Sequence, residues 1–165
     1  DGTPQPALAE EVEVFDQGMR YRFTLRDALW SDGEPVTAED FYYAWSTTLD
    51  PTFPAEWAHM LFSLKNGRAV KLGKKPMDEL GVRVLSPRVL EVVLENPSPY
   101  FLEQCAHPLF FPVPQHIVEQ DTVWDTYTDS QFISNGPFIF NLGHGVLPET
   151  PTHHIDQLIK QVRSQ

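Results

Sequence analysis

The sequence predicts an α+β fold, in which a mostly antiparallel sheet is combined with several short helices. Residues 19–26 alternate between apolar and polar side chains, as in a strand with one buried face. Residues 38–49 instead repeat their apolar side chains at helical spacing. Strand-like and helix-like stretches follow one another irregularly along the chain, which argues against a regular βαβ winding.

Composition and charge restrict the class of protein. The chain has 165 residues, 41% of them hydrophobic, which suits one globular domain with a hydrophobic core. The formal net charge of −11 disfavours nucleic acid and anionic membrane surfaces as partners, because both are themselves negative. No apolar run is long enough to span a bilayer. The first ten residues have no charged start and no apolar signal core, so we expect any export signal to lie outside this sequence.

The first predicted elements are two strands, at residues 11–15 and 19–26, joined by a connection at 16–18. Gly18 can adopt a positive φ in this connection. The second strand separates an apolar face from a polar one, which are Tyr21, Phe23 and Leu25 against Arg20, Arg22, Thr24 and Arg26.

A turn and a capped helix follow in the segment SDGEPVTAEDFYYAWSTTLDP, residues 31–51. Ser31, Asp32 and Gly33 are turn formers. Thr37 is a good N-cap, and Asp40 stands three residues later, as the partner in a capping box does. The segment therefore predicts a helix over residues 38–49.

Shorter elements fill the rest of the chain. Ser98 is expected to cap a helix in which Pro99 takes the first position. The predicted elements are helices at 55–64 and 66–72, a hairpin at 81–95 that turns at Ser86 and Pro87, helices after Ser98 and at 115–120, a strand at 136–142, and a short amphipathic helix within 153–165.

No constellation of catalytic residues is evident. Cys105 is the single cysteine and is interpreted as a small buried hydrophobe. His153, His154 and Asp156 suggest a metal at first sight, but adjacent histidines on a helix point in different directions, so solvated side chains are the better interpretation. No pair of carboxylates lies in an apolar setting. The sequence thus predicts no catalytic residue, no metal and no cofactor, and the enzyme hypothesis is disfavoured.

Five segments carry a family resemblance, in this order: PALAEEVEVFDQGMRYRFTLRD, LWSDGEPVTAEDFYYAWSTTLDP, GKKPMDELGVRVLSPRVLEVVLENPSPYF, HPLFFPVPQHIVEQ and SNGPFIF. Together they resemble the periplasmic oligopeptide-binding proteins, the solute-binding components of ABC peptide importers, over about residues 4–140. Full-length members form two lobes that close on a peptide, and this chain resembles the smaller subdomain of the N-terminal lobe. Residues 1–142 are therefore expected to form this subdomain, and residues 143–165 a divergent tail.

The resemblance implies a fragment of a solute-binding protein that captures oligopeptides noncovalently and closes by a hinge motion. The implied partners are the oligopeptide and a membrane ABC permease, and the implied location is the periplasm or another extracytoplasmic space, either free or lipid-anchored. Trp57 aligns with a family aromatic residue, often Tyr, that reaches the peptide pocket, so Trp57 is the candidate ligand-binding residue. The alternative is that its ring fills the core between two helices.

Two hypotheses follow for the isolated chain. As a subdomain of a larger receptor, it is expected not to bind peptide by itself. As a structural or interaction domain, it would self-associate, because the face that meets the larger subdomain would leave an apolar patch that a homodimer could cover. The ligand class within the family stays open between oligopeptides, dipeptides, nickel complexes, haem and opine-like solutes, although GKKPMDELGV favours oligopeptides.

Overall fold

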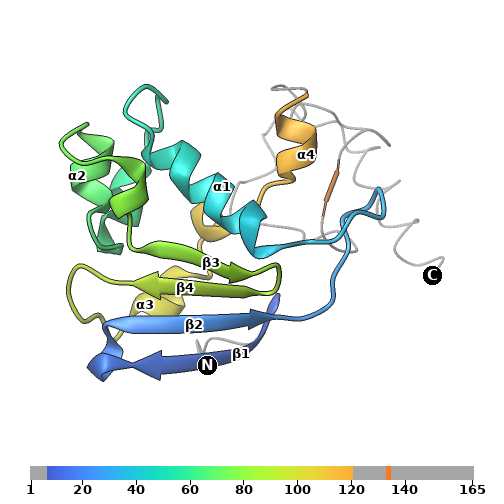
Figure 1. Ribbon diagram of the computed structural model, residues 1–165, viewed down its shortest axis with the longest axis horizontal. Helices are drawn as coiled ribbons and strands as arrows, with labels where there is room; N and C mark the ends of the chain where they lie inside the picture. Colours follow the sequence, from blue (N-terminus) through green and yellow to red (C-terminus); the bar gives the residue numbers. More distant parts are fainter. Residues whose placement is uncertain (1–6, 121–132, 135–165) are drawn as a thin grey trace, which may run out of the picture.

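A computed structural model describes residues 7–120 and 133–134 of the chain. The described residues contain a four-stranded antiparallel sheet with the strand order β1-β2-β4-β3 (Figure 1). The predicted α+β class is confirmed. The strands are β1 (Ala9–Phe15), β2 (Arg20–Leu25), β3 (Val82–Ser86) and β4 (Val89–Val93).

Strands β1 and β2 form the predicted hairpin, with small shifts at the ends. Strand β1 begins two residues before the predicted boundary, and β2 is one residue shorter at each end. The connection η1 (Asp16–Gly18) is a short 3-10 turn. Gly18 has the expected positive φ of 86°, and Asp16 and Gln17 also adopt positive φ, at 52° and 57°. Two residues with a Cβ thus share the left-handed region with Gly18 in this turn.

Helix α1 (Ala38–Leu49) has the predicted bounds. Thr37 is its N-cap, and the Asp40 carboxylate accepts the Thr37 N–H at 2.8 Å, as in a capping box. Ala44, Trp45 and Leu49 are buried on the core side of this helix. Helix α1 therefore starts at a defined cap and packs one apolar stripe against the core.

The other helices are short, and two predictions need correction. The helix predicted at 55–64 is instead the 3-10 helix η2, because its N–H groups bond three residues back, as Met60 does to Trp57. Ser98 is not a cap, since α3 begins at Phe101 and the Ser98 carbonyl accepts the Phe101 N–H in the preceding turn. These helices are η2 (Ala58–Ser63), α2 (Gly67–Lys71), η3 (Met77–Glu79), α3 (Phe101–Gln104), η4 (Pro108–Phe110) and α4 (Gln115–Val118).

The predicted hairpin within 81–95 is confirmed by strands β3 and β4, which pair in antiparallel register. The predicted strand at 136–142, the tail helix within 153–165 and the domain boundary at 142 lie outside the described residues. Within the described ranges, no helix combines the length and apolar character needed to cross a membrane.

The core lies between one face of the sheet and the helices α1 and α3. Tyr21 of β2 packs its ring 4.9 Å from that of Phe101 on α3, and Trp45 of α1 lies 5.6 Å from Phe110. Phe101 and Phe110 are themselves 6.1 Å apart, so the rings form a continuous aromatic cluster. The predicted apolar face of β2 is confirmed, because Tyr21, Phe23 and Leu25 are all buried.

The opposite face of the sheet is polar. The strand register places Glu13 beside Arg22, Arg22 beside Glu91, and Glu91 beside Arg83. Arg22 lies 3.7 Å from Glu13 and 3.4 Å from Glu91, so opposite charges alternate across the strands. One face of the sheet therefore stabilises the fold by apolar burial, while the other carries charge.

Candidate functional site

Trp57 lies at the surface, at the N-terminal end of η2. Its side chain is 57% exposed, and its ring centroid is 5.9 Å from that of His59, which is exposed as well. The ring therefore does not fill the core, where Trp45 lies instead. An exposed indole can stack on or pack against a ligand without moving the fold.

The segment that leads from α1 to Trp57 is held by polar contacts. The Lys71 amino group donates to the backbone carbonyls of Thr48, Asp50 and Phe53 at 3.0, 2.9 and 2.6 Å. The Asp50 carboxylate accepts the N–H and the hydroxyl of Thr52, and these hydrogen bonds lower the pKa of Asp50. Lys71 thus donates to carbonyls at the C-terminal end of α1, where a positive charge is favoured, and holds the start of the loop.

Exposed apolar side chains are found on both segments that Lys71 joins. Phe53 and Leu72 are 46% and 54% exposed, in addition to Trp57. The loop after α1 and helix α2 lie at the same end of the molecule in Figure 1. We call Phe53, Trp57 and Leu72 the apolar end.

The turn before α1 is organised around a buried carboxylate. Asp40 is 5% exposed, and its oxygens accept the Trp30 indole N–H at 3.3 Å, the Thr37 N–H at 2.8 Å and the Gln115 N–H at 3.2 Å. The carboxylate is therefore fully engaged and joins the turn, α1 and α4. Its role is architectural, because no reactive group is left free on it.

A second polar contact links the same turn to α4. The Asp32 carboxylate lies 2.7 Å from His116 Nε2, and the Ser31 N–H donates to the Ser134 carbonyl at 2.7 Å. Burial raises the pKa of Asp32, but hydrogen bonds from His116 and from the Glu34 N–H more than offset this, so the net pKa is lowered. The carboxylate is thus ionised at neutral pH and holds α4 against the turn.

The described residues show no reactive centre. Among them, no three His, Cys, Asp or Glu side chains converge in a way that could hold a metal ion. Burial raises the pKa of the Cys105 thiol to about 12, which keeps it protonated and supports its interpretation as a small packed hydrophobe. His153, His154 and Asp156 lie outside the described residues.

Comparison with known families accounts for this arrangement. A family model described as "Bacterial extracellular solute-binding proteins, family 5 Middle" matches residues 3–141. The chain belongs to this family. The family-5 match extends over nearly the same range as the predicted resemblance, and it confirms that resemblance.

The curated relatives that this chain matches are much longer than the chain. The oligopeptide-binding protein OppA of Bacillus subtilis is 39% identical over 139 residues, which cover 84% of this chain and 26% of the relative. The dipeptide-binding protein DppE of the same organism is 40% identical, with 84% and 25% covered. The probable deoxycholate-binding periplasmic protein YgiS of Escherichia coli is 39% identical, with 86% and 27% covered. The chain thus spans about a quarter of the length of these relatives.

Solved structures give the same result. The substrate-binding domain of an oligopeptide ABC transporter from Bacillus anthracis matches with a TM-score of 0.74 and 42% identity, over 81% of this chain and 26% of that one. Listeria monocytogenes OppA bound to peptide matches with a TM-score of 0.77 and 36% identity, over 83% and 27%. Members of this family are solute-binding proteins and not enzymes, in agreement with the prediction from the sequence.

Proposed function

We propose that this chain is the smaller subdomain of the N-terminal lobe of an extracytoplasmic solute-binding protein that captures oligopeptides for an ABC importer. The observation that carries the proposal is the family match over residues 3–141, combined with coverage of only about a quarter of the oligopeptide-binding relatives. A part of this size, with no converging reactive groups among its described residues, suits a supporting role in a larger receptor.

In this proposal, the subdomain supplies one edge of the peptide site through Trp57. The indole is 57% exposed, and Lys71 holds the backbone at Phe53, so the start of the loop before Trp57 has little backbone freedom to lose on binding. An indole contacts a peptide mainly through its apolar surface, so this edge would tolerate many side chains. Binding would be noncovalent and completed by closure of the second lobe.

The test replaces the matching segment of Bacillus subtilis OppA with residues 3–141 of this chain. Calorimetry with mixed tri- to pentapeptides is expected to show binding by this chimera and no micromolar binding by the isolated 165-residue chain. Trp57→Ala in the chimera should weaken binding by about tenfold, the cost of roughly 1.4 kcal/mol of lost aromatic contact. Leu72→Ala, which removes another exposed side chain of the apolar end, is the matched control and should leave the affinity unchanged.

The calorimetry results distinguish a failure of the proposed function from a failure of the role given to Trp57. A chimera that is folded by circular dichroism but binds no peptide would contradict the proposed function. A chimera that binds peptide equally well with and without Trp57 would contradict only the role of this residue. An extracytoplasmic location belongs to the same proposal, whereas lipid anchoring and homodimer formation are no part of it.

A further inference from the structure

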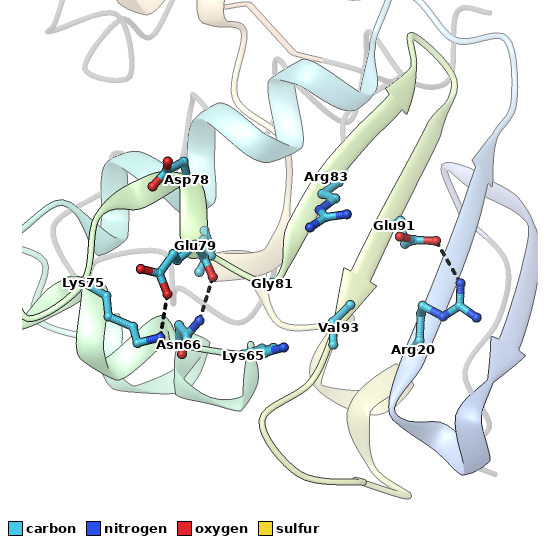
Figure 2. A pocket seen from close by; sticks show the side chains of 11 residues that line it. Arg20, Lys65, Asn66, Lys75, Asp78, Glu79, Gly81, Arg83, Glu91 and Val93 are labelled. Atoms are coloured by element: carbon cyan, nitrogen blue, oxygen red, sulfur yellow. Dashed lines mark hydrogen bonds and ion pairs between the residues drawn. The ribbon is translucent and has the colours of Figure 1, made fainter.

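A pocket of about 470 Å³, which Trp57 does not line, opens on the polar face of the sheet (Figure 2). One side is formed by Arg20 and Glu91 on β2 and β4, and the other by the segments around Lys65 and Glu79. Its volume lies in the range of small-molecule sites in proteins.

The main chain around the pocket is closely joined. The Lys65 N–H donates to the Val93 carbonyl at 2.9 Å, the Gly81 N–H to the Lys65 carbonyl at 2.9 Å, and the Val93 N–H to the Gly81 carbonyl at 2.6 Å. These bonds tie the two walls together at the base of the pocket. The backbone positions from which the wall side chains extend are therefore fixed relative to one another.

Two carboxylates of the pocket are neutralised by ion pairs. Glu79 lies 2.6 Å from the Lys75 amino group. Glu91 is 12% exposed at its side chain and lies 3.4 Å from both Arg20 and Arg22. Glu79 and Glu91 are therefore both occupied by cations that are already present in the structure.

Two cations of the pocket have no such partner. Within the described residues, neither Lys65 nor Arg83 makes a side-chain hydrogen bond or ion pair, although both line the pocket. In Figure 2, Arg83 extends from β3 into the space between the two ion pairs, and Lys65 lies along the opposite side. Asp78 also lines the pocket, and in Figure 2 its carboxylate points away from both cations.

We infer that this pocket binds a carboxylate between Arg83 and Lys65. Two unpaired positive charges that share one pocket repel each other, and a carboxylate relieves that repulsion. The guanidinium of Arg83 can bind both carboxylate oxygens, while the Lys65 ammonium acts as a point charge. The net charge of −11 repels polyanions, so the fitting ligand carries a single carboxylate, either the C-terminus of a short peptide or the side chain of an acidic residue.

Amide NMR titrations of the 165-residue chain test this inference. The probes are acetyl-alanyl-alanine, its C-terminal amide, and the α-amide of N-acetylglutamate. The free acid should shift the amide resonances of Asn66, Gly81 and Arg83 with millimolar affinity, and its amide should not. A response to the glutamate derivative alone would assign the site to acidic side chains, and a response to acetyl-alanyl-alanine alone would assign it to peptide C-termini.

Variants of the two cations complete the test. Arg83→Met and Lys65→Met should each weaken binding by about fivefold, as expected for loss of one partly solvated ion pair, and the double variant should abolish the shifts. Lys74→Met is the matched control, because Lys74 is exposed nearby but does not line the pocket. Equal shifts with the free acid and its amide, no shifts with any probe, or shifts that persist in the double variant would overturn the inference.

Discussion

Gly81 shows how little room the fold leaves at one residue. A Cβ atom at this position would lie 2.5 Å from the Val93 carbonyl oxygen and 2.6 Å from the Lys65 Cβ. Both neighbours are held by backbone hydrogen bonds to Gly81 itself, so neither can move away freely. We expect Gly81→Ala to lower the free energy of unfolding by about 2–3 kcal/mol, measured by urea denaturation.

Gly33→Ala is the control for this prediction. Gly33 has a φ of +94°, and no heavy atom lies within 4 Å of the place that an alanine methyl group would occupy, so its substitution costs backbone strain without a clash. That cost should be about 1 kcal/mol. If Gly81→Ala destabilises no more than Gly33→Ala, the segments at 65, 81 and 93 are less tightly joined than the hydrogen bonds indicate.

Cys105 gives a pH-dependent prediction at the same scale. Burial penalises the thiolate and raises the thiol pKa from 9.0 to about 12. The protonated thiol is therefore favoured in the folded state, so this contribution to stability is present below pH 9 and is lost as the pH rises toward 12. At pH 8 the folded chain should react with iodoacetamide roughly a thousandfold more slowly than the chain in urea, since three pKa units separate the two thiolate populations.

The single cysteine makes this labelling experiment unambiguous, because each alkylated chain carries one adduct. Mass spectrometry at intervals gives both rates directly. Equal rates in buffer and in urea would mean that Cys105 is open to solvent in the folded chain.

Some individual residues could be predicted from the sequence, and others could not. The buried face of β2 follows from strict alternation, and the Thr37 cap from local spacing, so both were predictable. The role of Lys71 was not, because its partner carbonyls lie 18 to 23 residues away and leave no periodic signal. Trp57 precedes the 3-10 helix η2, which apolar spacing does not distinguish from an α-helix, so its exposure was not predictable either.

At the scale of elements, α1 depends on one carboxylate. Asp40→Ala would leave the Trp30 indole, the Thr37 N–H and the Gln115 N–H without their acceptor. We expect a loss of about 3 kcal/mol in the free energy of unfolding, because buried unsatisfied donors add to the lost cap. Urea denaturation followed by circular dichroism measures this loss.

Glu39→Ala is the matched control, since it removes a neighbouring carboxylate that is exposed in the same helical turn. Its cost should stay near about 0.5 kcal/mol, from the helix dipole alone. Similar losses for the two variants would show that Asp40 acts through its charge near the helix end and not as a shared acceptor.

Element lengths were predicted well where a local signal ends the element. Helix α1 has both a cap and a following proline, and its bounds agree with the prediction. Helix α3 has no side-chain cap at its observed start, because Ser98 and Pro99 lie in the turn before it. Its first residue, Phe101, instead packs against Tyr21. Tertiary contacts of this kind cannot be read from spacing.

At the scale of the whole molecule, the two faces and the edge of the sheet have different physical roles. The apolar face forms the core, and the opposite face alternates charges across the strands. The outer strand β1 continues the apolar face with Val12 and Val14, which are 38% and 54% exposed. The core thus ends before the sheet does, and Val12 and Val14 leave an apolar strip on β1 through which two copies could associate.

Charge on β1 opposes that association. Two copies paired edge to edge through β1 would bring the Glu11 and Glu13 side chains of one copy near those of the other, and like charges across paired strands are destabilising. We therefore expect the wild-type chain to sediment as a monomer at pH 7 over a wide range of concentrations. The double variant Glu11→Gln, Glu13→Gln should self-associate, because it removes the repulsion and leaves Val12 and Val14 exposed.

A matched double variant, Glu34→Gln, Glu39→Gln, changes the net charge equally at other exposed positions and should stay monomeric. If this control associates as strongly, net charge and not the edge of β1 keeps the copies apart. A wild-type chain that is already a dimer would contradict the proposed repulsion at β1.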